Sequence, residues 1–169
     1  MKPKDIGRST AQHMAILRNQ ASILFWNGRV KTTFVRAKAT SSLAEKYLTM
    51  AIKTYKDVKK VEKDVIDKKG VKSKKAVLAD GPKKLAARRR LMALLYDLHE
   101  VKNKEESKKS FEKRTKNINH PLIEKIFNEL APKYAKRIEE TGQGGGYTRV
   151  LRLGTRRGDD GECAIVELV

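Results

Sequence analysis

Two lysine-rich stretches, residues 57–82 and 101–118, divide the apolar residues of this 169-residue chain into separate segments. In the first stretch lysine alternates with acidic residues, and the few apolar residues are mostly valine. Neither stretch carries enough apolar surface to form a core of its own. We therefore expect one domain made of residues 1–56, 83–100 and 119–169, interrupted twice. The first stretch is interpreted as a long hairpin or a loosely ordered excursion, and the second as a flexible linker or insertion.

The first segment begins with a short basic arm, residues 1–8, and continues with the periodicity of a helix. Ser9 or Thr10 is the expected N-cap, and Gly28 suits the left-handed residue that follows a helix C-terminus. Residues 29–33 alternate polar and β-branched side chains, which indicates a short strand. A second helix is expected from Phe34. Its predicted buried residues, spaced by four, are Val35, Ala39, Leu43, Tyr47 and Ala51.

Helical periodicity returns at residues 85–98, and again from Pro121 until Pro132 interrupts the pattern. A short helical turn is expected at residues 132–137. Residues 147–153 and 163–169 are expected to form two strands joined by a glycine-containing turn, which makes an antiparallel hairpin. The order of helix, strand, helices and two strands predicts a two-layer α+β domain with a small sheet and a C-terminal hairpin.

The charge of the chain favours a polyanionic partner. Lys and Arg number 39 against 20 Asp and Glu, which gives a net charge of +19 and a pI near 10.1. An excess of this size points to nucleic acid, or less often to an anionic membrane surface. No apolar run approaches the roughly 20 residues that span a bilayer, and no signal peptide is evident. The apolar helix faces are needed for the core, so we expect a soluble protein of a reducing compartment and no membrane partner.

The residues that usually carry catalysis or bind metals are poorly arranged in this sequence. Cys163 is alone, which excludes an internal disulfide and a cysteine-based zinc site. The three histidines show no ligand spacing, and the glycine-rich residues 142–146 lack the ending of a P-loop. Asp159 and Asp160 could hold Mg²⁺ weakly, but they are better interpreted as turn formers. We expect no metal, no cofactor, no small-molecule substrate and no enzymatic activity.

Four groups of side chains are candidate phosphate contacts, although each could also be a plain solvated surface. One of them lies where a strand leads into a helix N-terminus, which already favours anions. Another has three consecutive arginines, which point about 100° apart on a helix and cannot all be buried. The groups are Arg8, Arg18 and Asn19; Lys31, Thr32, Thr33, Arg36 and Lys38; Arg88, Arg89 and Arg90; and Tyr147, Thr148, Arg149, Arg152, Arg156 and Arg157.

Several short motifs follow one another along the chain: Gly7-Arg8, Leu17-Arg18-Asn19, Val30-Lys31-Thr32-Thr33, Arg36-Ala37-Lys38, Gly145-Gly146-Tyr147-Thr148-Arg149 and Arg156-Arg157-Gly158-Asp159. Together they resemble those of one family, the bacterial-type large-ribosomal-subunit protein seventeen. Apart from the two lysine-rich stretches, the resemblance extends nearly end to end. The chain departs from the family in its shorter N-terminal arm, and His13-Met14 stands where the family has a His-Arg pair.

The resemblance implies a structural protein in the ribosome of a bacterium, in the cytoplasm, with an organelle ribosome less favoured. It implies binding to large-subunit rRNA on the solvent side, with neighbouring large-subunit proteins near the exit tunnel. It also implies that the RNA-facing residues are Arg8, Arg18, Lys31, Arg36, Lys38, Arg88, Arg89, Arg149, Arg156 and Arg157. The alternative is a basic DNA- or RNA-binding factor that acts off the ribosome, although no helix-turn-helix spacing supports groove binding.

Overall fold

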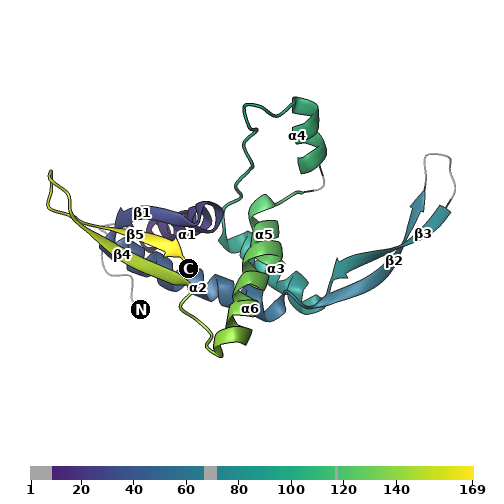
Figure 1. Cartoon of the computed structure of the whole chain (residues 1–169), viewed down its shortest axis with the longest axis horizontal. Helices are drawn as coiled ribbons and strands as arrows, with labels where there is room; N and C mark the ends of the chain where they lie inside the picture. The colour runs from purple at the N-terminus through teal and green to yellow at the C-terminus, as the bar shows by residue number, and fades with distance from the viewer. Residues whose placement is uncertain (1–8, 67–71, 117) are drawn as a thin grey trace.

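The computed structural model describes residues 9–66, 72–116 and 118–169, so the predicted basic arm lies outside the described residues. Within these ranges the chain forms an α+β fold with small antiparallel sheets, as predicted (Figure 1). The elements are α1 (Thr10–Asn27), β1 (Arg29–Thr33), α2 (Phe34–Thr54), β2 (Val58–Ile66), β3 (Lys72–Asp80), α3 (Pro82–Leu94), α4 (Lys108–Thr115), α5 (Pro121–Lys125), the π-helical turn η1 (Ile126–Leu130), α6 (Ala131–Thr141), β4 (Thr148–Thr155) and β5 (Glu162–Leu168).

The ends of α1 lie where the sequence predicts them. The Ser9 hydroxyl accepts a hydrogen bond from the Gln12 backbone N–H at 3.4 Å, which caps the first turn. Gly28 has a φ of 79° and its N–H donates to the Leu24 carbonyl oxygen. A residue with a side chain would be strained in this left-handed conformation, so glycine permits the turn directly into β1.

The buried face of α2 differs in part from the prediction. Tyr47 and Ala51 are buried as expected, but Val35 is 58% exposed. A constant spacing of four residues advances about 400° per step, so the line of predicted residues drifts around the helix by about 40° each time. Spacings of three and four together follow one face. The buried residues of α2 are Ala37, Thr40, Ala44, Tyr47, Leu48 and Ala51.

Strands β1, β5 and β4 form the larger sheet in that order, and all its pairings are antiparallel. The C-terminal hairpin of β4 and β5 confirms the prediction. Val166 of β5 lies between Val30 of β1 and Val150 of β4. Ala164 and Val166 are fully buried on the face that α1 and α2 cover, whereas Lys31 and Leu151, on the other face, are exposed. The sheet therefore has one covered and one open face.

The helical segment from Pro121 to Thr141 continues through Pro132, contrary to the interruption predicted there. The intervening turn η1 is π-helical, and the Ala131 N–H donates to the Ile126 carbonyl oxygen five residues earlier. This wider turn changes the hydrogen-bond register just before the proline, which then occupies the first turn of α6, where no N–H donor is required. The apolar residues that give this segment its helical periodicity are all buried: Leu122, Ile123, Ile126, Phe127 and Leu130.

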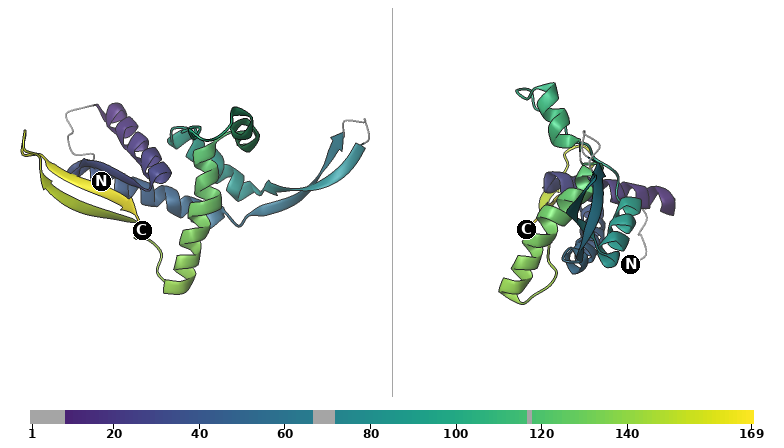
Figure 2. Two further views of the ribbon diagram at one scale, coloured as in Figure 1. Left: turned by 45° about the horizontal axis from the view of Figure 1, so that its top comes forward. Right: turned by 90° about the vertical axis from the view of Figure 1, so that its right-hand side faces the viewer.

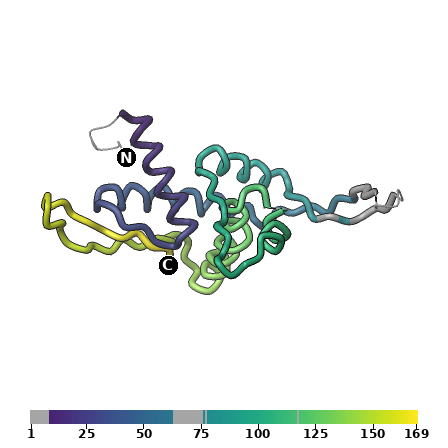
Figure 3. Tube along the Cα trace, turned by 90° about the horizontal axis from the view of Figure 1, so that it is seen from above, coloured from purple at the N-terminus to yellow at the C-terminus, as the bar shows by residue number. Residues whose placement is uncertain are grey.

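The lysine-rich stretches contain regular structure. Residues 57–82 include the antiparallel hairpin β2–β3, the first of the two forms expected, and residues 101–118 include α4, which the sequence did not predict. Helix α3 begins at Pro82 and ends at Leu94, earlier at both ends than expected. The β2–β3 and β4–β5 hairpins project toward opposite ends of an elongated molecule, with the helices between them (Figures 2 and 3).

Candidate nucleic-acid interface

The molecule can be divided into two halves by its elements. The sheet half consists of α1, β1, α2, β4 and β5, and the hairpin half consists of β2, β3, α3, α4, α5, η1 and α6. Between Ser9 and Lys56 the only acidic residue is Glu45. The Glu45 carboxylate accepts a hydrogen bond from the Thr148 hydroxyl at 3.1 Å, which occupies one of its oxygens. The helices of the sheet half therefore present cations with almost no carboxylates beside them.

The open face of the sheet carries part of this charge. Arg29 of β1 and Arg149 of β4 flank Glu167 of β5 in the strand register, and both arginines are exposed. In the next row on this face, Lys31 and the half-exposed Leu151 flank Ile165. Two of the predicted site residues, Lys31 and Arg149, therefore lie on one flat surface.

A second concentration of charge surrounds Phe34 at the start of α2. The Arg152 guanidinium carbon lies 4.1 Å from the centroid of the Phe34 ring, and Lys38 Nζ lies 5.2 Å from it. Both distances are within the range of a cation–π interaction. The ring therefore holds two cations near each other without a carboxylate, and brings together predicted residues from two elements far apart in the sequence.

The remaining predicted residues of the strand-to-helix junction are partly engaged within the fold. The Thr32 hydroxyl accepts a hydrogen bond from Gln20 Nε2 at 2.9 Å, and Gln20 Oε1 accepts one from Thr40 at 2.9 Å. Thr33 occupies the N-cap position of α2, but its side chain makes no capping hydrogen bond. Arg36 is half-buried and makes no ion pair with a described residue. At this junction the charge of Arg36 is therefore not paired with a carboxylate of the described residues. The Thr32 hydroxyl, in contrast, is linked through Gln20 of α1 to Thr40 of α2 and contributes to the packing of these helices.

Of the first predicted group, Arg8 lies outside the described residues. Asn19 is exposed, and Arg18 is half-buried beside Tyr47. Burial raises the pKa of the Tyr47 hydroxyl, and the nearby Arg18 charge opposes that rise. The buried Nε of Arg18 has no hydrogen-bond partner in the described part of the chain. Arg18 is therefore only partly available to a partner.

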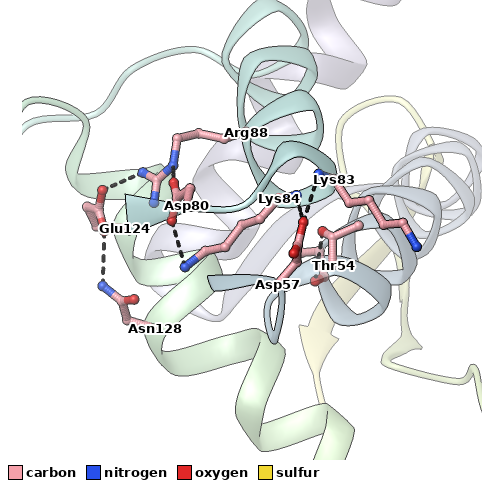
Figure 4. A network of polar contacts seen from close by, with 9 residues as sticks. Thr54, Asp57, Asp80, Lys83, Lys84, Arg88, Glu124 and Asn128 are labelled. Carbon is pink, nitrogen blue, oxygen red and sulfur yellow. Dashed lines mark hydrogen bonds and ion pairs between the residues drawn. The ribbon is translucent and has the colours of Figure 1, made fainter. Parts of the chain in front are cut away.

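Arg88 is held inside the hairpin half (Figure 4). Its Nε donates to Asp80 Oδ2 at 2.6 Å, another of its nitrogens donates to Glu124, and its guanidinium carbon lies 5.3 Å from the Phe127 ring centroid. The two carboxylates raise the pKa of Arg88 against the effect of its burial. Arg88 connects the end of β3 with α5 and contacts Phe127 of η1, which is the geometry of a structural residue.

Asp80 is bound from two sides in this network. Lys84 Nζ lies 2.9 Å from its second carboxylate oxygen (Figure 4). Burial alone would raise the pKa of Asp80, but the hydrogen bonds and charges of Lys84 and Arg88 outweigh it and hold the pKa below its usual value. The other two predicted arginines of this group, Arg89 and Arg90, are exposed and make no ion pair with a described residue.

Hydrogen bonds of Asp57 connect the base of the β2–β3 hairpin to the start of α3. Its carboxylate accepts hydrogen bonds from the backbone N–H groups of Lys83 at 2.8 Å and Lys84 at 3.4 Å (Figure 4). Its carbonyl oxygen accepts one from the Gly81 N–H at 2.9 Å. A carboxylate at a helix N-terminus is stabilised by the free N–H groups there. A side chain at Gly81 would collide with the Asp57 carboxylate. The hairpin is therefore connected tightly to the helices.

The C-terminal group of predicted residues divides between the core and the surface. Tyr147 is 3% exposed, and its ring centroid lies 5.0 Å from that of Tyr134, so it packs in the core instead of facing a ligand. The Thr148 hydroxyl is bonded to Ser41 as well as to Glu45. At the hairpin tip, Arg156 lies 2.8 Å from Asp159, whereas Arg157 is exposed without an ion pair to a described residue.

The structure adds three residues of α2 that the sequence analysis missed. Ser42, Lys46 and Thr49 line a groove beside β4, together with Phe34 and Lys38. A signal was present in the sequence, because Lys38, Ser42 and Lys46 recur every four residues in a segment with one acid. The packing of β4 against α2, which forms the groove, could not be predicted from that spacing.

Within the described residues, no group of His, Cys, Asp and Glu side chains is arranged to hold a metal ion. No helix in these ranges is long and apolar enough to cross a membrane. The fold and its surface therefore define a class: a small basic α+β protein in which the helices of one half carry cations with almost no acidic residues among them.

Comparisons with known proteins identify the family. The family described as Ribosomal protein L17 matches residues 16–169. The chain is 35% identical to "Large ribosomal subunit protein bL17" of Lachnospira eligens, with 99% of each chain covered. It is 37% identical to the protein of that name from Ruminiclostridium cellulolyticum, with 98% of each covered, and 32% identical to that of Clostridioides difficile, with 99% of this chain and 98% of the relative covered. The chain belongs to the ribosomal protein L17 family.

Proposed function

We propose that this protein is a structural, non-enzymatic constituent of the large ribosomal subunit that binds and stabilises large-subunit rRNA in the bacterial cytoplasm. Its relatives carry the name of a large-subunit protein and cover nearly its whole length. The observation that carries the proposal is the near absence of carboxylates beside the cations of α1 and α2, since Glu45 is the only acid from Ser9 to Lys56. Such a surface neutralises phosphates and releases condensed counterions.

The proposed RNA-binding residues are those that the fold leaves exposed or half-buried, without ion pairs in the described ranges. They are Arg18, Lys31, Arg36, Lys38, Arg89, Arg90, Arg149, Arg152 and Arg157, with Asn19 as a polar contact. Arg8, Thr33 and Arg156 remain candidates from the sequence. Because the cations are spread over an open sheet face and a helix, recognition is expected to depend on RNA shape and phosphate placement. The proposed neighbours are other large-subunit proteins near the exit-tunnel side.

Sedimentation of a cell lysate tests this function. We expect the protein to sediment with the large subunit in about equal amounts to other subunit proteins, and to remain there after a high-salt wash. Release at moderate salt into the free or nucleoid fraction would contradict the proposal. That result would favour a loosely bound nucleic-acid factor that acts off the ribosome.

A further inference from the structure

The groove between α2 and β4 is lined in part by side chains that have no ion pair or hydrogen bond with a described residue, such as Lys46 and Ser42. It has a volume of about 960 Å³, and β4 contributes Val150 to its wall. Lys38, Ser42, Lys46 and Thr49 are spaced by four, four and three residues, so they share one side of α2. From Lys38 to Thr49 this side extends for about 16 Å along the helix.

The charge in the groove is positive and is not compensated from within. Lys46 makes no ion pair with any residue that the structure describes, and the contact recorded for Lys38 is with the Phe34 ring. Arg152, also over Phe34, adds a cation at the same end. The one acid of the groove, Glu45, already accepts the Thr148 hydrogen bond. A ligand that enters this groove meets two lysines and one engaged carboxylate, with Arg152 near one end over the Phe34 ring.

The polar groups of the groove match a sugar–phosphate backbone. Ser42 is exposed and has no hydrogen-bond partner among the described residues. Thr49 donates to the Glu45 carbonyl oxygen at 2.8 Å, which leaves its lone pairs to accept from a ribose hydroxyl. Lysines and hydroxyls in a row contact phosphates and sugars without selecting a base.

The edge of the sheet beside the groove is poorly suited to an added peptide strand. β4 is an edge strand, and its pairing with β5 is irregular between Arg152 and Gly154. Bulges and charged residues at an edge oppose the addition of another strand. We propose that the α2–β4 groove binds the sugar–phosphate backbone of a single RNA strand that runs along α2. This site rests on the proposed function and names where one strand of the rRNA lies.

Paired lysine substitutions test the groove. Lys38→Gln with Lys46→Gln removes two charges eight residues apart, and Lys108→Gln with Lys116→Gln removes two exposed charges at the same spacing around α4. Binding of the full chain to large-subunit rRNA is measured over a series of salt concentrations, after circular dichroism confirms folding. We expect the slope of log K against log salt to fall by about 1.4 to 1.8 for the groove variant. The α4 variant should lose less than half as much.

The outcomes separate this site from the general function. If the unchanged protein binds rRNA but the groove variant behaves like the α4 variant, the groove proposal is wrong and the function stands. If the unchanged protein shows no preference for large-subunit rRNA over an unrelated RNA of equal length, the proposed function fails.

Crosslinking identifies the occupant directly. Ser42→Cys in a Cys163→Ser background places a single thiol in the groove, to which a benzophenone is attached before assembly into the large subunit. We expect a crosslink to rRNA. A crosslink only to another ribosomal protein, or none in a correctly assembled subunit, would overturn the proposal.

Discussion

Arg88 and Arg114, in the hairpin half, each contact two carboxylates: Arg88 those of Asp80 and Glu124, and Arg114 those of Glu100 and Glu106. Lys38 and Arg152, in the sheet half, lie over an aromatic ring and contact no carboxylate of the described residues. Cations of the first kind hold the β2–β3 hairpin and α4 in place. Cations of the second kind leave their charge available to a partner.

The contrast shows that net charge alone does not locate a binding surface. Lysines and arginines are abundant in both halves, but in the hairpin half acidic residues are interleaved with them and occupy part of their charge. A cation that is already paired with a carboxylate inside the fold must give up that ion pair before it can bind a phosphate. The interface is therefore expected where carboxylates are missing.

The largest expected effect is a difference in stability between variants of two adjacent arginines, Arg88 and Arg89. Arg88→Ala leaves Asp80 and Glu124 without their common partner, and should lower the free energy of unfolding by about 2 to 3 kcal/mol. This is less than the roughly 3 to 5 kcal/mol for a fully buried pair, because both carboxylates retain some exposure. Arg89→Ala removes an exposed side chain and should change stability by no more than about 0.5 kcal/mol. Urea denaturation of both variants measures the difference.

RNA binding should rank the same two variants in the opposite order. Arg89→Ala is expected to weaken binding to large-subunit rRNA and to reduce its salt dependence, whereas folded Arg88→Ala should bind nearly as the unchanged protein does. Equal stability of the two variants would contradict the structural role of Arg88. Equal loss of RNA affinity would show that pairing inside the fold does not decide availability.

A smaller effect is expected at the tip of the β4–β5 hairpin, where a paired and an unpaired arginine are again adjacent. Arg157→Gln should reduce the slope of log K against log salt by about 0.7 to 0.9, the value for one lost phosphate contact. Arg156→Gln should reduce it less, because Asp159 already offsets that charge. Filter binding at several salt concentrations measures both slopes. Unchanged slopes in both variants would remove the tip from the interface.

Much of the fold could be predicted from periodicity and turn residues. Ser9 and Gly28 mark the ends of α1, and alternation identifies β1 and the C-terminal hairpin, because these signals depend on a few neighbouring residues. The continuation of the helix past Pro132 could not be predicted, because it depends on the wider turn η1. Helix α4 was missed because none of its eight residues is buried, and the contacts of its Arg114 are with Glu100 and Glu106 in the preceding segment.

For the candidate interface, the sequence predicted which groups of cations are present but not which of their members are paired or buried in the fold. The groups of cations are visible in the sequence, but their pairing depends on partners far along the chain, such as Arg88 with Glu124 or Thr148 with Glu45. Tyr147, two residues before the exposed Arg149, was grouped with the surface residues, although it packs on Tyr134. Sequence position alone cannot decide which of two near neighbours faces the core.

The smallest expected effect is on stability at acid pH, where the paired carboxylate of Asp80 in the hairpin half becomes protonated. The pKa of Asp80 is lowered in the folded protein by Lys84 and Arg88, so its stabilising contribution is complete above the unfolded value of about 3.9. That contribution is lost as the pH falls through the lower pKa of the folded state. The difference in unfolding free energy between the unchanged protein and Asp80→Asn should therefore be constant from pH 7 to 5 and should shrink as the pH falls below about 4.

Repeating this comparison in an Arg88→Ala background sharpens the argument. Without Arg88, the pKa of Asp80 should lie closer to its unfolded value, so the same loss should be smaller and should be complete at a higher pH. A difference that does not change with pH down to 3 in either background would show that Asp80 is not stabilised as a carboxylate. The hairpin would then be held by Asp57 and by apolar packing, and the ion pairs of Asp80 with Lys84 and Arg88 would contribute nothing to its stability.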